Sequence, residues 1–294
     1  MGKTGATPVT DFNRGSGLLI IEVKNSNPNG DPDAESEPRT LDTDGRGLIS
    51  PVSFKRKLRD LAAEKSGPVW AAASSSLMLG ANGRGFDILE ARGRDRKSIA
   101  ALDIEAMKNK FWDGRLFGNT FIEEGDKGKF ITTGAVQFGP GISVAPIEVT
   151  RLTLTNKAGV EGDKDRGMAP LAWRAVVHAV YVMPFFVNPT AAQRSGCDER
   201  DIDLLKFLIP HAYPHTASAI QPFVEMLHAW YAEHKSPLGS CPDSLIINAM
   251  TPRRKGDPNE PSRSIEDYDI PTELPPEIRS RLASFEDLCT KSWG

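Results

Sequence analysis

Cysteine is scarce in this sequence, and its few copies are scattered. The 294 residues include Cys197, Cys241 and Cys289, which lie far apart and form no C-x-x-C pair. This pattern argues against a disulfide framework and a zinc knuckle, and it fits a reducing compartment, so we expect a cytoplasmic protein. No charged segment followed by an apolar run opens the chain, which predicts that it has no signal peptide.

Long hydrophobic runs and a strong net charge are also lacking. The longest apolar run, 176–187, contains His178 and Pro184 and is too short to span a bilayer, so we expect no membrane partner. The net charge is −3, which excludes a protein that binds polyanions over its whole surface. A nucleic-acid site must therefore be a local basic patch, offset by acid such as the acidic C-terminal segment at about 251–294.

Motifs for nucleotide hydrolysis and for nucleophilic catalysis are missing. The sequence has no Walker A motif, no complete dinucleotide fingerprint, no G-x-S-x-G and no S-x-x-K. His211 and His215 lie four residues apart, but Pro210 and Pro214 preclude the helix that would put both imidazoles on one face. We therefore expect no cofactor, no resident metal and no enzymatic activity.

One stretch, residues 17–60, combines more specific signals than any other. It opens with an apolar run, 18–23, that predicts a strand buried on both faces of a sheet. The run ends in Asn-Pro-Asn-Gly-Asp-Pro-Asp, residues 27–33, where two prolines and Asn29-Gly30 favour a stiff turn. Such a turn presents backbone N–H groups and carboxylates at the end of a strand.

A basic helix is predicted after this turn. Ser50 is a good N-cap and Pro51 suits the first helical position. The apolar positions Phe54, Leu58, Leu61 and Ala62 recur at helical spacing and should face the sheet. The basic residues must then lie on the flanks or the outer face: Lys55, Arg56, Lys57 and Arg59. This charge run has two interpretations, a solvated helix face or a phosphate-binding surface.

Two carboxylates in the turn leave a catalytic alternative open. Asp31 and Asp33 could hold Mg²⁺ beside a phosphodiester, which would make the protein a metal-dependent ribonuclease. An Asp in an Asn-Gly-Asp-Pro turn more often accepts hydrogen bonds from nearby backbone N–H groups. The calcium-loop pattern D-x-[DN]-x-[DN]-G is broken by Pro28, and Ser36 stands where that loop needs Glu. We favour the turn interpretation.

The stretch also resembles a known family. The series of strand, Asn-Pro-Asn-Gly-Asp turn, Gly-Leu-Ile-Ser and Lys-Arg-Lys-Leu-Arg is similar to the N-terminal signature of the CRISPR-associated Cas-seven family, in the RRM-like RAMP superfamily. The likeness continues in order through Trp112–Gly118, Gly134–Gly139 and Phe185–Pro189. The chain departs from the pattern around Asp113 and at Ala135, where the family usually has Pro.

The resemblance implies a fold and a role. The fold would be α+β, a single RRM-like (ferredoxin-like) palm over residues 1–294 with a finger-like insertion at about 66–129 and a thumb loop. The role would be that of the backbone subunit of a type I Cascade complex, polymerising as a helical filament along the guide RNA (crRNA). The implied partners are guide RNA, target DNA, further copies of the chain and other Cascade subunits. Related type III subunits cut target RNA with a loop aspartate, which keeps the ribonuclease alternative open.

Guide RNA is single-stranded, so its recognition needs phosphate contacts and stacking surfaces. For Phe138 and Met168, a place in the hydrophobic core explains the sequence equally well. A basic but non-nucleic-acid oligomeric protein is the remaining interpretation. The expected RNA-binding residues are Asn27, Asn29, Gly30, Arg39, Ser53, Lys55, Arg56, Arg59, Gln137, Phe138, Arg166 and Met168.

The remaining elements follow from local patterns. We predict an irregular segment over 66–98, a helix over 99–112, strands over 130–138, 142–155 and 171–187, and a helix from Asp198 to about Pro210. Further along, the spacing of apolar residues predicts a helix over 216–233, a strand over 244–249 and an amphipathic helix over 277–288.

Overall fold

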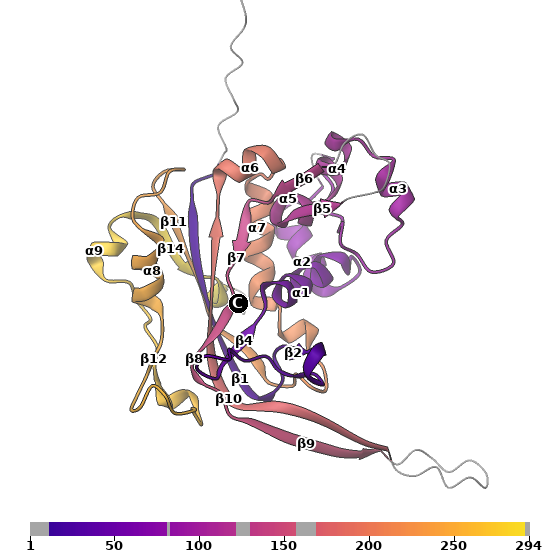
Figure 1. The fold of residues 1–294 in the computed structure, drawn as a ribbon. Helices are drawn as coiled ribbons and strands as arrows, with labels where there is room; N and C mark the ends of the chain where they lie inside the picture. The colour runs from indigo at the N-terminus through magenta and orange to yellow at the C-terminus, as the bar shows by residue number, and fades with distance from the viewer. Residues whose placement is uncertain (1–11, 81–82, 122–129, 157–168, 292–294) are drawn as a thin grey trace, which may run out of the picture.

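A central antiparallel sheet carries helices on one side and the C-terminal segment on the other (Figure 1). The structure is a computed structural model that describes residues 12–80, 83–121, 130–156 and 169–291. In this part of the chain the main sheet has eight strands in the order β14, β11, β1, β10, β8, β4, with β7 and β9 also paired to β10. Their bounds are β1 Gly15–Ser26, β4 Arg46–Ile49, β7 Val136–Phe138, β8 Gly141–Pro146, β9 Val149–Asn156, β10 Ala169–Val187, β11 Val224–His234 and β14 Leu282–Asp287.

Strand β1 lies in the middle of this sheet, as its apolar run predicts. It pairs with β10 on one edge and with β11 on the other, both antiparallel. Because successive side chains of a strand point to opposite faces, Leu19 and Ile21 pack into the core beneath the helices. Leu18 and Ile20 pack into a second core on the C-terminal side. The prediction of a strand buried on both faces is confirmed.

Strand β10 is the longest strand and joins several others. One edge pairs with β1, while the other edge pairs in turn with β7, β8 and β9. The far end of β10 forms a two-stranded ribbon with β9 that projects from the body of the molecule (Figure 1). The strands predicted over 130–138, 142–155 and 171–187 are confirmed, the first two being divided into shorter strands.

One face of the sheet is covered by a layer of helices, here called the helix layer. Its two main members, α1 and α7, contact each other and bury apolar side chains against the sheet. The predicted start of α7 after Asp198 is confirmed, with Asp198 accepting a hydrogen bond from the backbone of Asp201. The helices are α1 Pro51–Ala63, α2 Pro68–Ser76, α3 Arg96–Ala100, α4 Ile104–Lys110, α5 Trp112–Phe117, α6 Pro189–Ser195 and α7 Glu199–Leu208.

Residues 235–281 cover the opposite face, and they are called here the C-terminal layer. They include α8 Asp243–Met250, a short pair of strands, β12 Arg253–Arg254 and β13 Tyr268–Asp269, and the one-turn α9 Pro276–Arg279. Ile246, Met250 and Tyr268 pack onto the second core. Two further short pairs lie elsewhere: β2 Gly30–Asp31 with β3 Glu37–Pro38, and β5 Gly118–Phe121 with β6 Phe130–Thr133.

Three predictions near the C-terminus were wrong. The segment predicted as a helix over 216–233 contains β11, whose residues are buried on both faces: Tyr231 enters one core and Trp230 the other. Because polar and apolar residues do not alternate regularly along this strand, the spacing of its apolar residues is also compatible with a helix. The predicted strand over 244–249 is α8. Half of the predicted helix over 277–288 is β14, an edge strand paired with β11, and its first residues belong to the one-turn α9.

The insertion also differs from its prediction. Residues 66–98 include α2, where the sequence indicated only irregular structure. The single helix predicted over 99–112 is divided into α3, α4 and the start of α5, because Asp103 caps a new helix and Phe111 is extended. Among the described residues, no helix is both long enough and apolar enough to cross a membrane.

Candidate nucleic-acid interface

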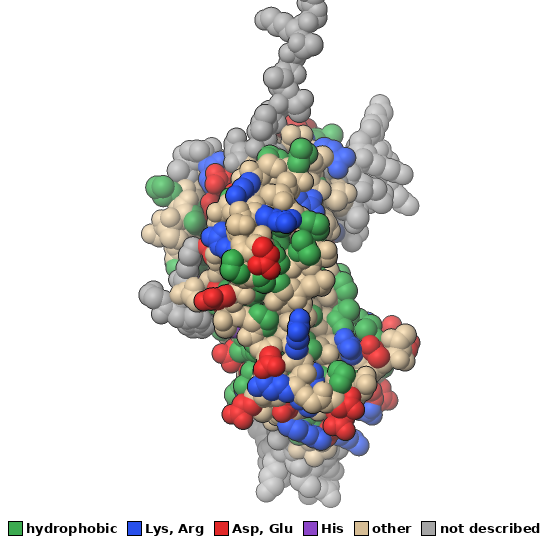
Figure 2. All heavy atoms as spheres, turned by 90° about the vertical axis from the view of Figure 1, so that its left-hand side faces the viewer, with side chains coloured by type: hydrophobic (Ala, Val, Ile, Leu, Met, Phe, Trp, Pro, Cys, Tyr) green, Lys and Arg blue, Asp and Glu red, His purple; other side chains and the backbone are tan. Residues whose placement is uncertain are grey.

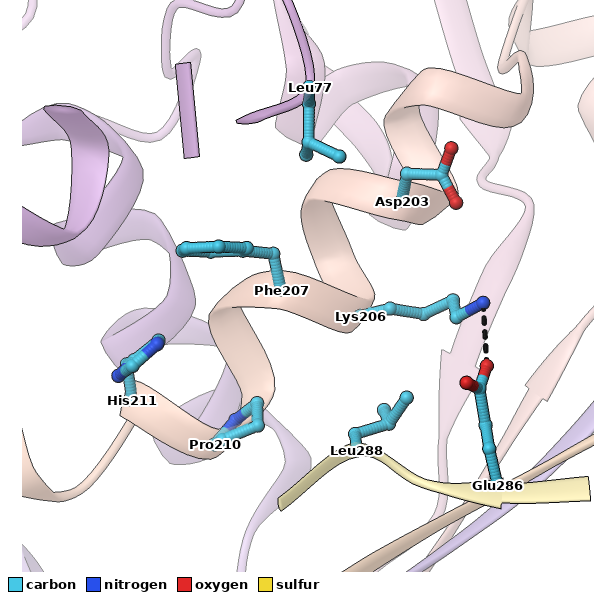
Figure 3. A pocket seen from close by; sticks show the side chains of 8 residues that line it. All are labelled: Leu77, Asp203, Lys206, Phe207, Pro210, His211, Glu286 and Leu288. Carbon is cyan, nitrogen blue, oxygen red and sulfur yellow. Dashed lines mark ion pairs between the residues drawn. The ribbon is translucent and has the colours of Figure 1, made fainter. Parts of the chain in front are cut away.

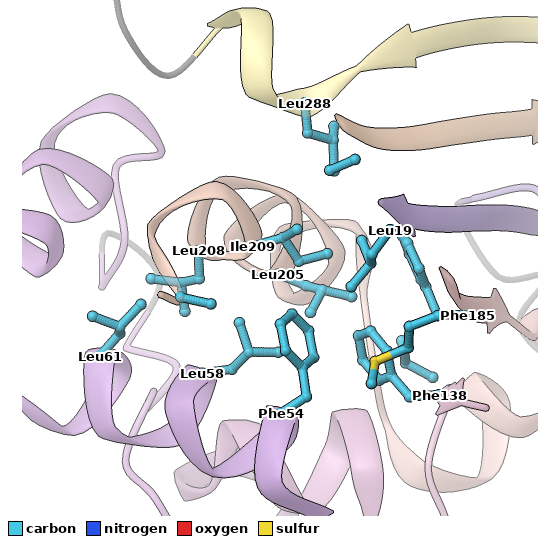
Figure 4. Close-up of a cluster of buried hydrophobic side chains, with 14 of the residues drawn as sticks. Leu19, Phe54, Leu58, Leu61, Phe138, Phe185, Leu205, Leu208, Ile209 and Leu288 are labelled. Carbon is cyan, nitrogen blue, oxygen red and sulfur yellow. The ribbon is translucent and has the colours of Figure 1, made fainter. Parts of the chain in front are cut away.

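Helix α1 is built as the sequence predicts, and its construction decides where its charges lie. The Ser50 side chain accepts a hydrogen bond from the backbone N–H of Ser53, and Pro51 occupies the first turn. Phe54 and Leu58 are fully buried against the sheet (Figure 4). With that stripe in the core, Lys55, Arg56 and Arg59 are left at one side of the helix, where they line a groove.

This groove, here called the α1 groove, has a volume of about 570 Å³. Lys55, Arg56 and Arg59 form its basic wall, and Gln137 of β7 faces it from another element. Three of these four residues carry a positive charge, whereas Glu90 is the one acidic residue among the described residues that line the groove. The described residues that line it are Val52, Lys55, Arg56, Arg59, Glu90, Phe117, Gly118, Asn119, Thr133 and Gln137. Four of the twelve residues predicted from the sequence to bind RNA thus come together in one hollow.

The charges of the α1 groove are crowded. Burial, and to a lesser degree the charge of Arg59, lowers the pKa of Lys55. The Lys55 ammonium and the Arg59 guanidinium both lie over the ring of Phe117, at 5.5 and 5.1 Å from its centroid. Arg56 has only a loose ion pair with Asp60, at 3.6 Å. An anion that entered the groove would relieve the repulsion between the first two cations.

Lys57 does not belong to this surface, which corrects the expectation that it lies on a flank or on the outer face. Its ammonium donates to the hydroxyl of Thr216 at 2.9 Å and to the side-chain oxygen of Gln221 at 3.1 Å. Burial lowers the pKa of Lys57. Its charge is therefore used to attach α1 to the loop before β11.

The Asn-Pro-Asn-Gly-Asp turn supports the start of α1. The side-chain oxygen of Asn29 accepts a hydrogen bond from the Ser50 N–H at 2.7 Å, and the amide of Asn27 donates to the Ser36 carbonyl at 2.7 Å. Asn27 is buried, and a Cβ on Gly30 would lie 2.9 Å from the Ser36 carbonyl oxygen. These three predicted residues hold the turn together, and none of them lines the α1 groove.

Of the two carboxylates in the turn, that of Asp31 already has partners within the protein. Asp31 accepts from the Asp33 N–H at 3.1 Å and lies 3.4 Å from a terminal nitrogen of Arg39. Asp33 is exposed. Arg39, predicted to contact RNA, thus lies at the turn and outside the lining of the α1 groove. Within the part of the chain that the structure describes, no three His, Cys, Asp or Glu side chains are grouped as metal ligands.

The ring of Phe138 belongs to the hydrophobic core, which is one of the two interpretations that the sequence left open for this residue (Figure 4). It is 7% exposed and stacks on Phe185 with ring centroids 5.1 Å apart. Its neighbour Gln137 is exposed because alternate residues of a strand face opposite ways. Ser53 is half-buried beside the groove. Arg166 and Met168 lie outside the described residues.

Sequence reasoning missed the residues that hold the groove in shape. Asp113 of α5 is 1% exposed, and its carboxylate accepts from Arg59 Nε at 2.8 Å. Asp201 of α7 is fully buried and forms a two-point ion pair with Arg115, at 2.7 and 2.9 Å. Arg115 also donates to backbone carbonyls of the insertion. The Asp-Gly-Arg pattern in Trp112–Gly118 was the available signal, but pairing across the fold is not visible in a sequence.

A second hollow of about 180 Å³ lies beside the C-terminal half of α7 and the turn that follows it (Figure 3). Phe207, Pro210 and Leu288 give it an apolar lining, and Lys206 forms an ion pair with Glu286 at 2.8 Å across its edge. None of the residues predicted to bind RNA lines it. With one cation already paired, this hollow does not offer the positive surface that a phosphate backbone requires.

The C-terminal layer shows a different surface (Figure 2). On that face Lys and Arg side chains lie among Asp and Glu, and no basic stripe stands out. Several of the cations are paired there, such as Lys255 with Asp269 at 3.5 Å. The α1 groove is therefore the better candidate for a nucleic-acid interface.

Comparison with known proteins places these features in context. Residues 13–273 match the profile of a family described as CRISPR-associated protein Cas7. A protein of that description from Haloferax volcanii is 38% identical over 52 residues, a match that spans 18% of this chain and 15% of the relative.

Chains of two solved structures show a similarity to this chain. A chain of "CRISPR RNA-guided surveillance complex, pre-nicking" has a TM-score of 0.45 and 16% identity, and the alignment covers 75% of this chain and 78% of that one. A chain of "Cryo-EM structure of the Type III-B Cmr-beta bound to cognate target RNA" has a TM-score of 0.40 and 10% identity, with coverages of 75% and 61%.

Proposed function

The chain belongs to the Cas7 family of CRISPR-associated proteins, and from this premise we propose that it binds guide RNA as a backbone subunit of a type I Cascade complex. Several copies would line up along one guide RNA as a filament and present its bases to target DNA, together with other Cascade subunits. The observation that carries the proposal is the α1 groove, in which Lys55, Arg56 and Arg59 meet Gln137.

The chemistry of the groove suits a single-stranded backbone of any sequence. A backbone subunit must accept every spacer, so it needs contacts to phosphates more than contacts to base edges. Ammonium and guanidinium groups supply such contacts, and the Gln137 amide can donate or accept. The Phe117 ring lies beneath two of the cations and is 7% exposed, so it shapes the groove and offers little surface for stacking.

The arrangement of the sheet supports an RRM-like palm. Along the chain come a strand (β1), a helix (α1), a pair of strands (β8 and β10), a helix (α7) and a last strand (β11). In space their order is β11, β1, β10, β8, which is the fourth, first, third and second strand of a β-α-β-β-α-β unit. We take the whole chain as one such RNA-binding unit, with the insertion at about 66–129 as fingers and the β9–β10 ribbon as the thumb.

We further propose that the chain does no chemistry. Asp31, one of the two carboxylates on which the ribonuclease alternative rests, accepts a hydrogen bond within its own turn and neighbours Arg39. These contacts favour a structural role for the turn over a magnesium site. The α1 groove is a separate place: residues of α1, of β7 and of the insertion line it, and neither Asp31 nor Arg39 is among them.

The test is a salt titration of RNA binding with a matched pair of double variants. Lys55→Ala plus Arg56→Ala removes two charges from the α1 groove, whereas Arg253→Ala plus Lys255→Ala removes the same charges from exposed positions of the C-terminal layer. We expect the first variant to bind a labelled single-stranded RNA at least about tenfold more weakly. Its slope of log affinity against log salt should fall by roughly 1.4, since each lost phosphate contact lowers it by about 0.7.

The control variant should keep the affinity and most of the slope of the unmodified chain. Fluorescence anisotropy over a series of NaCl concentrations gives both quantities. Equal losses in the two double variants would mean that the net charge of the chain matters and its groove does not. An unchanged slope in the first variant would contradict the groove assignment.

A further inference from the structure

Asp113 connects three parts of the molecule at the edge of the α1 groove. One carboxylate oxygen accepts from the Leu89 N–H at 2.6 Å, and the other accepts from the Glu90 N–H at 3.2 Å and from Arg59 Nε at 2.8 Å. The carboxylate is therefore bound to the insertion loop and to the basic helix at once. With 1% exposure it has almost no contact with solvent.

This binding fixes the direction of the Arg59 guanidinium. Asp113 engages only Nε, so the fork formed by the two terminal nitrogens points away from the carboxylate. Among the described residues these terminal nitrogens have no hydrogen-bond partner. The guanidinium rests over the Phe117 ring, which limits its rotation from the other side. Arg59 thus presents two oriented donors to the groove that it lines.

We propose that Asp113 is a positioning residue for RNA binding, which acts by holding Arg59 in the orientation that meets a phosphate. The inference rests on the proposed function of the α1 groove and adds to it the residue that pre-organises one of its contacts. It also explains why a carboxylate stands beside a site for an anion. Its negative charge weakens the field of the groove, yet its hydrogen bond orders a side chain that would otherwise sample many rotamers.

An effect of the negative charge alone and a positioning role for Asp113 lead to opposite predictions for one substitution. Asp113→Asn removes a negative charge next to the groove, so an effect of charge alone would tighten RNA binding. If Asp113 positions Arg59, the same substitution should weaken binding, because the asparagine oxygen can still accept from one backbone N–H while its amide repels the Arg59 Nε–H. We expect a loss of roughly tenfold, the size of one charge-assisted contact.

A double-variant cycle separates positioning from general damage to the fold. In a chain that already carries Arg59→Ala, adding Asp113→Asn should change the affinity for a labelled single-stranded RNA by less than about twofold, since the group that Asp113 positions is gone. Arg59→Lys is the conservative companion: it keeps the charge but lacks the fork, so it should bind nearly as weakly as Arg59→Ala. Circular dichroism of each variant checks that it is folded.

The outcomes are distinct. Tighter or unchanged binding by Asp113→Asn, or full binding by Arg59→Lys, would overturn the positioning role while leaving the groove assignment in place. A further tenfold loss on adding Asp113→Asn to Arg59→Ala would also overturn it, because Asp113 would then act without Arg59. If the unmodified chain bound no RNA, the proposed function itself would fail, and the inference with it.

Discussion

On the helix side of the sheet two arginines, Arg59 and Arg115, are paired with buried aspartates, whereas on the C-terminal side buried histidines make the hydrogen bonds. In the helix layer, Arg115 and Asp201 are 1% and 0% exposed and share a two-point ion pair. On the other face, His178 contacts Ser262 at 2.7 Å and Glu22 at 3.1 Å, and it is 1% exposed. One layer is attached by groups with a permanent charge, and the other by a group whose charge depends on the pH.

This difference follows from what each layer has to do. The helix layer carries the basic groove, so its cations must keep both their charge and their direction. The C-terminal layer only has to cover an apolar face, where Leu18, Ile20 and Trp230 need shielding from water. Neutral hydrogen bonds among His178, Ser262 and Tyr268 are sufficient for that purpose. We therefore expect the two layers to lose their packing against the sheet under different conditions.

The largest effect is expected from Asp201→Ala in the helix layer. It leaves Arg115 buried without its counter-charge and removes a partner of Arg84, so the free energy of unfolding should fall by about 3–5 kcal/mol. Urea denaturation followed by fluorescence measures this quantity. Asp203→Ala is the matched control two residues along the same helix, where burial raises the pKa of the carboxyl and no cation among the described residues forms an ion pair with it. Its cost should stay below about 1 kcal/mol, and similar losses in both variants would contradict a special role for the buried pair.

A smaller effect is expected from acid on the C-terminal layer. Burial is the main cause that lowers the pKa values of His178 and His234 below their ordinary value of 6.5. Below that value the unfolded chain binds protons that the folded chain does not, so stability should fall as the pH falls from about 6.5. His211, just after the end of α7, has a pKa lowered by burial as well, so hydrogen exchange should show this loss in residues 243–281 and at the end of α7, while α1 remains protected.

His178→Gln keeps a neutral hydrogen-bonding side chain and should reduce the pH dependence of that exchange. The matched control is His215→Gln, because His215 is exposed. If acid loosened α1 and the C-terminal layer together, the contrast between the two layers would be wrong.

The accuracy of the predictions made from the sequence also differs between the two layers. Around α1, local signals agree with tertiary structure: Ser50 caps the helix, Phe54 and Leu58 face the core, and the basic residues that remain line a groove. Near the C-terminus they disagree, because β11 is buried on both faces and β14 exists only through its pairing with β11. A strand of that kind has no alternation of polar and apolar residues by which to recognise it.

In the candidate site, too, the sequence predicts some residues and misses the roles of others. Lys55, Arg56 and Arg59 could be predicted from the sequence because helical spacing and charge are local properties, whereas Gln137 is predicted because its segment resembles the family. Lys57 could not be separated from its neighbours, since only the loop at Thr216 and Gln221 shows why its ammonium is buried. The roles of Asp113 and Asp201 depend on partners 54 and 86 residues away along the chain. Such pairings come from the fold and carry no local signature.

The most direct test of the central claim, that the α1 groove holds RNA and the C-terminal layer does not, is ultraviolet cross-linking of the protein to single-stranded RNA with the cross-linked peptides identified by mass spectrometry. We predict cross-linked peptides from residues 52–59 and 133–137, which line the groove from both sides. Peptides from residues 243–281 should carry none. Cross-links concentrated in 243–281, with none in 52–59, would contradict the account.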